Sequence, residues 1–254
     1  MIDLHDKRGL VIGIANDRSI AWGCAKAFRA AGAELAMTYL NEKAEPAVRP
    51  LAEQLQSPLV MPCDLRRPGE LEAVFAAIRA QWGRLDFLLH AVAYAPKEAL
   101  QARLLDCPHD GFLLAMDISC YSLISMARLA APLMTAGGSL LTLSFLGSAR
   151  VAPHYNVMGP VKAALEATVR YLAAELGPSG IRVNSISPGP IATRAASGIA
   201  QFEQLQQQVA ARLPGRVPVS IDDVGALAAF LVGDAARNIS GGVHYVDSGF
   251  HTLM

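Results

Sequence analysis

The residues best suited to chemistry in this chain are Tyr155 and Lys162, a phenol and an ammonium seven positions apart. On a helix of ~3.6 residues per turn, this step covers about 700°, so both side chains are expected on one helix face. A nearby ammonium favours the phenolate, so the spacing predicts a lowered pKa for Tyr155. Such a hydroxyl can donate to an oxygen that gains charge during a reaction. Ordinary helix faces also carry such pairs, so the interpretation depends on the surrounding sequence.

Composition limits the kinds of protein that this chain can be. It has 254 residues, of which 52% are hydrophobic and 17% charged, with 22 basic and 22 acidic side chains. No linker-like segment divides it, so a single domain over residues 1–254 is expected. Balanced charge gives no global field to recruit nucleic acid or an anionic membrane surface. The apolar stretches are interrupted before the ~18 residues that span a bilayer, so no membrane partner is expected.

Cysteine and histidine usage adds two further expectations. The four cysteines show no paired spacing, and the first residues carry charges instead of an apolar signal region. These features indicate the reducing cytoplasm. The six histidines lack the spacing of a metal site, so no metal is expected.

Short apolar runs alternate with longer amphipathic stretches along the whole chain. The alternation predicts an α/β fold: a Rossmann-like, doubly wound, seven-stranded parallel sheet with helices on both faces. The expected strands are residues 10–14, 34–39, 58–61, 86–91, 139–144, 182–187 and 243–246. The expected helices are 20–31, 42–56, 68–82, 110–133, 156–176 and 221–231. Ser220 and Asp223 resemble a capping box, and Pro160 must lie in the first turn of its helix.

The segment from Gly13 to Gly23 connects the first expected strand to the first expected helix. Gly13 permits a tight turn, and free N–H groups at the helix start can hold a pyrophosphate. Ser19 is placed to cap the helix and to donate to the phosphate. The segment lacks the G-x-G-x-x-G fingerprint, so it indicates phosphate binding only in combination with other residues.

Further candidates also follow expected strands. Asp64 ends the third strand, where its carboxylate either accepts from an adenine amine or caps the next helix. After the second strand, residues 39–42 offer no arginine for a ribose 2′-phosphate, which favours NADH over NADPH, although Lys43 lies nearby. Ligands of doubly wound sheets bind at the carboxyl ends of the strands. This context assigns Tyr155 and Lys162 to a nicotinamide site.

The chain resembles the enoyl-[acyl-carrier-protein] reductases, a divergent branch of the short-chain dehydrogenase/reductase superfamily with a Tyr-x6-Lys pair. The resemblance covers essentially the whole chain and rests on segments 13–21, 144–147, 155–159, 188–191, 195–199 and 246–250. It implies NADH-dependent reduction of trans-2-enoyl thioesters in fatty acid synthesis, with the substrate carried on acyl carrier protein or CoA. It also implies a cytoplasmic homotetramer.

The resemblance implies a role for each site residue. Tyr155 would hydrogen-bond the thioester oxygen and stabilise the enolate, and Lys162 would hold the nicotinamide ribose hydroxyls. The implied cofactor contacts are Gly13, Ser19, Ile20, Leu40, Asp64, Leu65, Val92, Lys162, Ile191 and Thr193. The implied substrate contacts are Ala95, Phe145, Tyr155, Ile199 and Phe202. Residues 190–213 would form a flexible lid over the acyl chain.

The chain departs from the family pattern at several positions. Many relatives have a tyrosine where this chain has Phe145, so Tyr155 must supply the oxygen contact alone. Leu40 replaces a polar residue often used near the adenosine. The lid lacks the basic residues that relatives often present to the acidic carrier protein, which predicts weak carrier selectivity unless Arg194 and Arg212 substitute. The lid residues concerned are Ala200, Glu203 and Gln204.

Two other functions stay open at this point. A carbonyl reductase acting on a ketone would use Thr142, thirteen residues before Tyr155, in place of the usual serine. The Tyr-x6-Lys spacing argues against it. A catalytically idle nucleotide-binding protein would retain only the fold, and Phe145 and the altered lid are compatible with that interpretation.

Overall fold

A computed structural model describes residues 2–194, 196–214 and 217–253. Ala195 of the expected lid and the terminal residues Met1 and Met254 of the expected domain lie outside the described residues. The strands form one seven-stranded parallel sheet in the order β3-β2-β1-β4-β5-β6-β7, which confirms the predicted doubly wound α/β fold. The strands are β1 (Arg8–Ile12), β2 (Glu34–Tyr39), β3 (Leu59–Pro62), β4 (Phe87–His90), β5 (Gly138–Leu143), β6 (Ile181–Pro188) and β7 (Val243–Val246).

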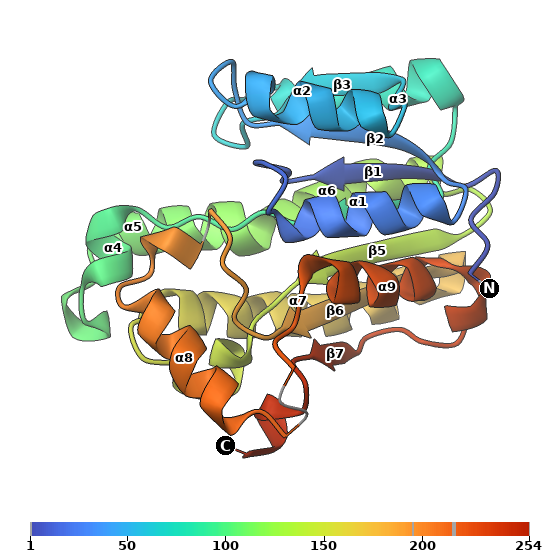
Figure 1. Ribbon diagram of the computed structural model, residues 1–254. Coiled ribbons are helices and arrows are strands. Elements are labelled where there is room, and N and C mark those ends of the chain that lie inside the picture. The colour runs from blue at the N-terminus through green and yellow to red at the C-terminus, as the bar shows by residue number, and fades with distance from the viewer. Residues whose placement is uncertain (1, 195, 215–216, 254) are drawn as a thin grey trace.

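Helices cover both faces of the sheet (Figure 1). One face carries α3 (Glu70–Trp82), α6 (Ser122–Ala130) and α7 (Met158–Leu176). The other carries α1 (Ile20–Ala30), α2 (Glu45–Gln54) and α9 (Ile221–Val232). Neighbouring strand residues enter opposite cores, as Leu88 and Leu89 of β4 do, and both are fully buried. Burial on both faces explains why these strands read as continuous apolar runs.

Residues His109–Leu133 form one helical run against the sheet. It consists of α5 (His109–Met116), a π-helical turn (Asp117–Tyr121), α6 and a 3-10 turn (Ala131–Leu133). The run is long enough to cross a membrane, and an 18-residue window within it has a mean hydropathy of 1.4. By length and composition alone, the expectation that no apolar stretch is long enough is therefore wrong. Leu123 and Met126 are nevertheless fully buried in the core beside α7. One side of the run, including Leu123 and Met126, therefore packs into the core of this α/β layer.

Three further helices lie near the edge where the strands end. They are α4 (Lys97–Gln101), α5 and α8 (Phe202–Arg212), and they project beyond the carboxyl ends of the strands in Figure 1. The described residues also include 3-10 turns at Leu104–Asp106, Leu146–Ser148, Gly177–Ser179, Ala196–Gly198, Asp234–Ala236 and Phe250–Leu253. Together, α4, α5 and α8 add structure only at the edge where doubly wound sheets bind ligands.

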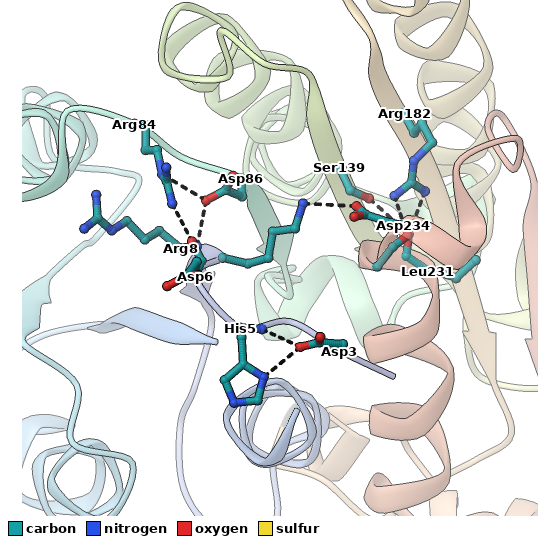
Figure 2. A network of polar contacts seen from close by, with 12 residues as sticks. Asp3, His5, Asp6, Arg8, Arg84, Asp86, Ser139, Arg182, Leu231 and Asp234 are labelled. Atoms are coloured by element: carbon teal, nitrogen blue, oxygen red, sulfur yellow. Dashed lines mark hydrogen bonds and ion pairs between the residues drawn. The ribbon is translucent and has the colours of Figure 1, made fainter. Parts of the chain in front are cut away.

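The opposite edge of the sheet is tied together by polar contacts (Figure 2). The Arg8 amide donates to Asp86 Oδ2 at 2.8 Å, and Arg84 Nε lies 3.5 Å from the same oxygen. Arg182 Nη1 donates to the Leu231 carbonyl at 2.6 Å, near the end of α9. A cation there satisfies a helix-terminal carbonyl and complements the helix dipole. This edge therefore has a structural role.

Helices α1 and α9 approach each other closely at Gly23. A Cβ atom there would lie 2.2 Å from the Ile221 carbonyl oxygen, a backbone atom that cannot rotate away. We expect Gly23→Ala to lower the free energy of unfolding by about 1–3 kcal/mol, because α9 must shift. Gly177→Ala is the matched control, since nothing lies within 4 Å of its added Cβ. Urea unfolding measures both, and equal stabilities for the two variants would contradict the packing argument.

Candidate active site

Tyr155 lies in a turn before α7, which begins at Met158. The expectation that Tyr155 and Lys162 share one helix face is therefore wrong. His154 and Asn156, on either side of Tyr155, have φ angles of 62° and 43°, which are outside the helical region. The Asn156 side chain donates to the Leu100 carbonyl at 2.8 Å and connects this turn to α4. The first turn of α7 does contain Pro160, as predicted.

Residues 145–147 enclose the Tyr155 ring. The Phe145 and Tyr155 ring centroids are 4.9 Å apart, and a Cβ on Gly147 would lie 2.4 Å from Tyr155 Cδ1. Tyr155 is 8% exposed. Burial, and then the negative charge of Glu166, raise the pKa of Tyr155. The expected lowering by Lys162 is therefore wrong, and the hydroxyl stays protonated as a hydrogen-bond donor.

Lys162 is a buried cation at the end of β5. Its side chain is 4% exposed, and Nζ donates to the Leu143 carbonyl at 2.6 Å. Burial lowers the pKa of Lys162 to about 8, although Cys120 and Glu166 act in the opposite direction. Among the described residues, Leu143 is the one hydrogen-bond acceptor of Nζ, so this buried ammonium has a strong need for further acceptors, such as hydroxyls of a ligand.

Glu166 was missed by the sequence analysis. Its Oε1 atom accepts hydrogen bonds from Ser144 Oγ at 2.5 Å and Ser148 Oγ at 2.6 Å. Glu166 therefore connects α7 to both ends of the segment that encloses the Tyr155 ring. The signal in the sequence is its spacing, because residues four apart on a helix share a face and Glu166 follows Lys162 by four.

His90, at the end of β4, is also buried near the site. Ser122 Oγ donates to the Ile118 carbonyl, so it accepts from His90 Nε2 at 2.8 Å, and Thr142 Oγ1 donates to His90 Nδ1 at 2.7 Å. Burial and Lys162 lower the pKa of His90 to about 3, so the ring is neutral. Thr142 is fully buried and its hydroxyl is used in this network, which argues against the carbonyl reductase interpretation.

The loop after β1 lies against the loop after β4. Gly13 has a φ of 114°, and a Cβ there would lie 2.1 Å from the Ala91 carbonyl oxygen, so the position requires glycine. Ser19 is the N-cap residue of α1, as expected, but its side chain makes no cap hydrogen bond, so that part of the expectation is wrong. Its Oγ instead accepts from the Ala15 and Asn16 amides, both at 3.0 Å. The strand order reverses between β1 and β4, and this close turn with a helix start fits a dinucleotide phosphate.

Asp64 is held by an arginine that the sequence analysis did not identify. Arg66 donates to both Asp64 carboxylate oxygens, at 2.9 and 2.7 Å, and lowers the pKa of Asp64. The alternative that Asp64 caps the next helix is wrong, because Gly69 is the N-cap of α3. Arg66 also lies 5.8 Å over the Tyr94 ring and so connects the loops after β3 and β4.

The remaining predicted cofactor and substrate contacts lie mainly at the edges of the two cores. Those beside α3, α6 and α7 are Leu65, Val92, Ala95, Phe145 and Ile199. Those beside α1, α2 and α9 are Ile20 and Ile191. Phe202 is partly buried, and Leu40 is 48% exposed. Thr193 Oγ1 accepts from the Ala196 amide at 3.2 Å.

A largely apolar pocket of ≈ 210 Å³ lies between the segment after β5 and α8. Of the predicted substrate contacts, Phe145 lines it, whereas Ala95, Tyr155, Ile199 and Phe202 do not. The lining residues include Phe145, Leu146, Ala152, Pro153, Leu205, Val209, Arg212 and Phe250. Gln206 Nε2 donates to the Pro190 carbonyl at 3.0 Å and fixes α8 over this pocket. The end of the chain thus contributes Phe250, a lining residue that was not predicted.

Comparisons with known proteins agree with this geometry. The family model of enoyl-(acyl carrier protein) reductases matches residues 13–251. An NADH-dependent enoyl-[acyl-carrier-protein] reductase of Rhizobium meliloti is 47% identical over 250 residues, covering 98% of this chain and 92% of the relative. The corresponding enzyme of Bacillus subtilis is 46% identical over 250 residues, covering 98% and 97%.

Solved structures give the same result at the level of the backbone. The Anaplasma phagocytophilum enoyl-(acyl-carrier-protein) reductase in complex with NAD has a TM-score of 0.94 and 47% identity, covering 98% of this chain and 95% of the other. The Bacillus cereus enzyme with NADP⁺ and indole naphthyridinone has a TM-score of 0.97 and 45% identity, covering 100% of both. Because sequence and backbone agree over nearly the full length, this chain belongs to the enoyl-(acyl carrier protein) reductase family.

Proposed function

We propose that this chain reduces trans-2-enoyl thioesters to saturated acyl thioesters with NADH, as a step of fatty acid synthesis. The observation that supports this most directly is the buried pair at the end of β5, with Lys162 4% and Tyr155 8% exposed. A protonated phenol and a cation at this edge can bind a developing oxyanion and hold a nicotinamide ribose. The resemblance of the whole chain to NADH-dependent reductases supports the same reaction.

Different residues of the chain would bind the cofactor, stabilise the enolate and exclude water. NADH would supply the hydride, and the Gly13 loop, Ile191 and Lys162 would hold it. Tyr155 donates a hydrogen bond to the thioester oxygen and stabilises the enolate that forms there. Phe145 has no hydroxyl and packs against the ring of Tyr155, at a centroid separation of 4.9 Å, so it excludes water from one side. The raised pKa of Tyr155 keeps its donor proton in place.

The remaining predicted cofactor contacts, Ser19, Ile20, Leu40, Asp64, Leu65, Val92 and Thr193, belong to the same proposal. Ala95, Ile199 and Phe202 are proposed to contact the acyl chain, and residues 190–213 to act as the lid. The docking of α8 by Gln206 onto the Pro190 carbonyl supports this role for the lid. We further propose a cytoplasmic homotetramer. Large exposed apolar side chains on α5 and α6, namely Leu113 and Ile124, support an assembly of copies.

A spectrophotometric assay of NADH oxidation tests this function. We expect activity with crotonyl-CoA and with enoyl-acyl carrier protein, and none with a panel of ketones. NADPH is expected to be the poorer cofactor. Activity on ketones alone would support the carbonyl reductase, and no activity on either class would support the idle nucleotide-binding protein.

The same assay measures the preference for the thioester carrier. The first turn of α8 carries the exposed Glu203 and Gln204, so electrostatic steering of an acidic carrier protein is weak there. We expect kcat/KM values for CoA and carrier-protein thioesters of the same chain length to agree within about tenfold. A preference of about a hundredfold for the protein-bound form would contradict weak selectivity.

A further inference from the structure

The segment from Ser144 to Ser148 is bound at both ends by one carboxylate. Ser144 Oγ and Ser148 Oγ both donate to Glu166 Oε1, at 2.5 and 2.6 Å. Between these two serines lie Phe145 and Gly147, the residues that enclose the Tyr155 ring. The carboxylate thus fixes the segment that defines where the Tyr155 ring lies.

The contacts around the Tyr155 ring leave little space for a shift of this segment. A Cβ on Gly147 would lie 2.4 Å from Tyr155 Cδ1, so the Gly147 backbone lies directly against the ring. A Cβ on Gly159, in the first turn of α7, would lie 3.2 Å from the Gly147 carbonyl oxygen. The segment therefore lies between α7 and the ring, and a displacement of either serine would be transmitted to the Tyr155 hydroxyl.

From this geometry we propose that Glu166 is a positioning residue for the reductase reaction, which orients Tyr155 through Ser144 and Ser148 and provides the counter-charge for Lys162. The proposal rests on the proposed roles of Tyr155 and Lys162. In this proposal Glu166 is a positioning residue and not a catalytic residue. Glu166 acts on Tyr155 through the hydrogen-bonded segment from Ser144 to Ser148, and on Lys162 through its negative charge.

The electrostatic part follows from the position of Glu166 on α7, one helical turn after Lys162. The Glu166 charge raises the pKa of Lys162, Tyr155 and Tyr245. Other titratable groups face the same region from neighbouring elements. They are His90 of β4, Cys120 of the π-helical turn, Arg150 after the segment, Tyr245 of β7 and Asp247 after β7. Burial holds the pKa of Lys162 at about 8, and the charges of Cys120 and then Glu166 oppose it, so the Glu166 charge extends the pH range over which Lys162 stays protonated.

The experiment separates the two parts with two variants. Glu166→Gln keeps an oxygen acceptor but removes the charge, and the Ser144→Ala/Ser148→Ala double variant keeps the charge but removes both hydrogen bonds. The kcat/KM for NADH is measured from pH 6 to 10, because it reports groups of the free enzyme. At the alkaline end of this pH profile kcat/KM falls, and we call that part of the curve the alkaline limb. We expect the alkaline limb of Glu166→Gln to lie at lower pH than that of the wild type by about half to one pH unit, since loss of a negative charge lowers the pKa of Lys162.

The double variant is expected to lose about tenfold in kcat, with an unchanged alkaline limb, because the Tyr155 hydroxyl is displaced while the charges stay. Glu166→Asp is expected to have the same alkaline limb as the wild type, in contrast to Glu166→Gln, since the carboxylate is retained. Glu175→Gln, at an exposed glutamate of the same helix, is the matched control and should change neither quantity. Thermal unfolding of each variant checks that the fold is intact.

Two results would overturn the proposal. One is a Glu166→Gln enzyme whose kcat and alkaline limb both match those of Glu175→Gln. The other is a double variant with wild-type kcat, a result that stays decisive even where Glu166→Gln fails to fold. Failure of the proposed catalytic roles is distinguishable, because it would be seen as wild-type turnover by Tyr155→Phe in the same assay.

Discussion

Tyr155→Phe is expected to lower kcat by about 10²–10³-fold, because it removes the single proposed donor to the substrate oxygen. The ring of Phe145 lies beside that of Tyr155, at a centroid separation of 4.9 Å. Phe145 cannot replace the lost donor, because its side chain carries no hydroxyl. The contacts of the ring with Phe145 and Gly147 persist in the variant. The KM for NADH is therefore expected to stay within about twofold, and the loss is confined to turnover.

Tyr171→Phe provides the matched control for this variant. Tyr171 lies on α7 and is 79% exposed, so loss of its hydroxyl should leave kcat unchanged. Steady-state kinetics with crotonyl-CoA measure both variants. Wild-type turnover by Tyr155→Phe would remove the proposed role of the hydroxyl and leave binding as the function of this site.

Local sequence patterns predicted the sheet well where burial on both faces determined the pattern. The bounds of β2 and β7 match those expected, and the capping box of Ser220 and Asp223 is present. β1 lies two residues earlier than expected, at Arg8–Ile12. Ile14 extends the apolar run, but Gly13 at a φ of 114° has already turned the chain. A buried loop residue cannot be distinguished from a strand residue by hydrophobicity alone.

The helices at the binding edge were harder to predict. The apolar positions Phe202, Leu205 and Val209 of α8 have helical spacing, yet Gln201 before them has a φ of 55° and gives no capping signal. The π-helical turn at Asp117–Tyr121 also has no pattern in the sequence. It places Ser119 within 2.9 Å of the Tyr94 amide, a contact that depends on the tertiary fold.

The residues of the site were predictable to the extent that strand ends and family motifs identify them. The direction of the shift in the Tyr155 pKa could not be predicted, because burial raises this pKa and outweighs the lowering expected from Lys162. The role of Asp64 was left between two alternatives, and Arg66 became visible only through its hydrogen bonds. Charge interactions depend on desolvation and on partners from distant segments, which spacing along one helix does not report.

Lys162→Met is expected to lower kcat/KM by at least about 10²-fold and, at the same time, to stabilise the protein at pH 7. Activity falls because the buried cation is lost. Stability rises because burial of this ammonium is unfavourable, as its lowered pKa of about 8 shows. Methionine fills a similar volume without a charge. Loss of activity together with a gain in stability is typical of sites that keep an unfavourable group for function.

The pH dependence gives this prediction its sign. The pKa of Lys162 is about 8 in the folded protein, below its ordinary value of 10.5, so between these two pH values the unfolded chain binds more protons. The free energy of unfolding therefore rises with pH across this window, by up to about 3 kcal/mol, and below about pH 8 the folded protein carries the full cost. Lys162→Met removes this slope, and the variant should be more stable than the wild type at pH 7 by about 1–3 kcal/mol. The gain is reduced because the Leu143 carbonyl loses its hydrogen-bond donor.

Lys97→Met, at an exposed lysine of α4, should keep the slope of the wild type. Urea unfolding at pH 7 and at pH 10 measures both variants. A Lys162→Met protein that is less stable than wild type at pH 7, with the slope unchanged, would show that the buried ammonium stabilises the fold and that its retention needs no functional reason.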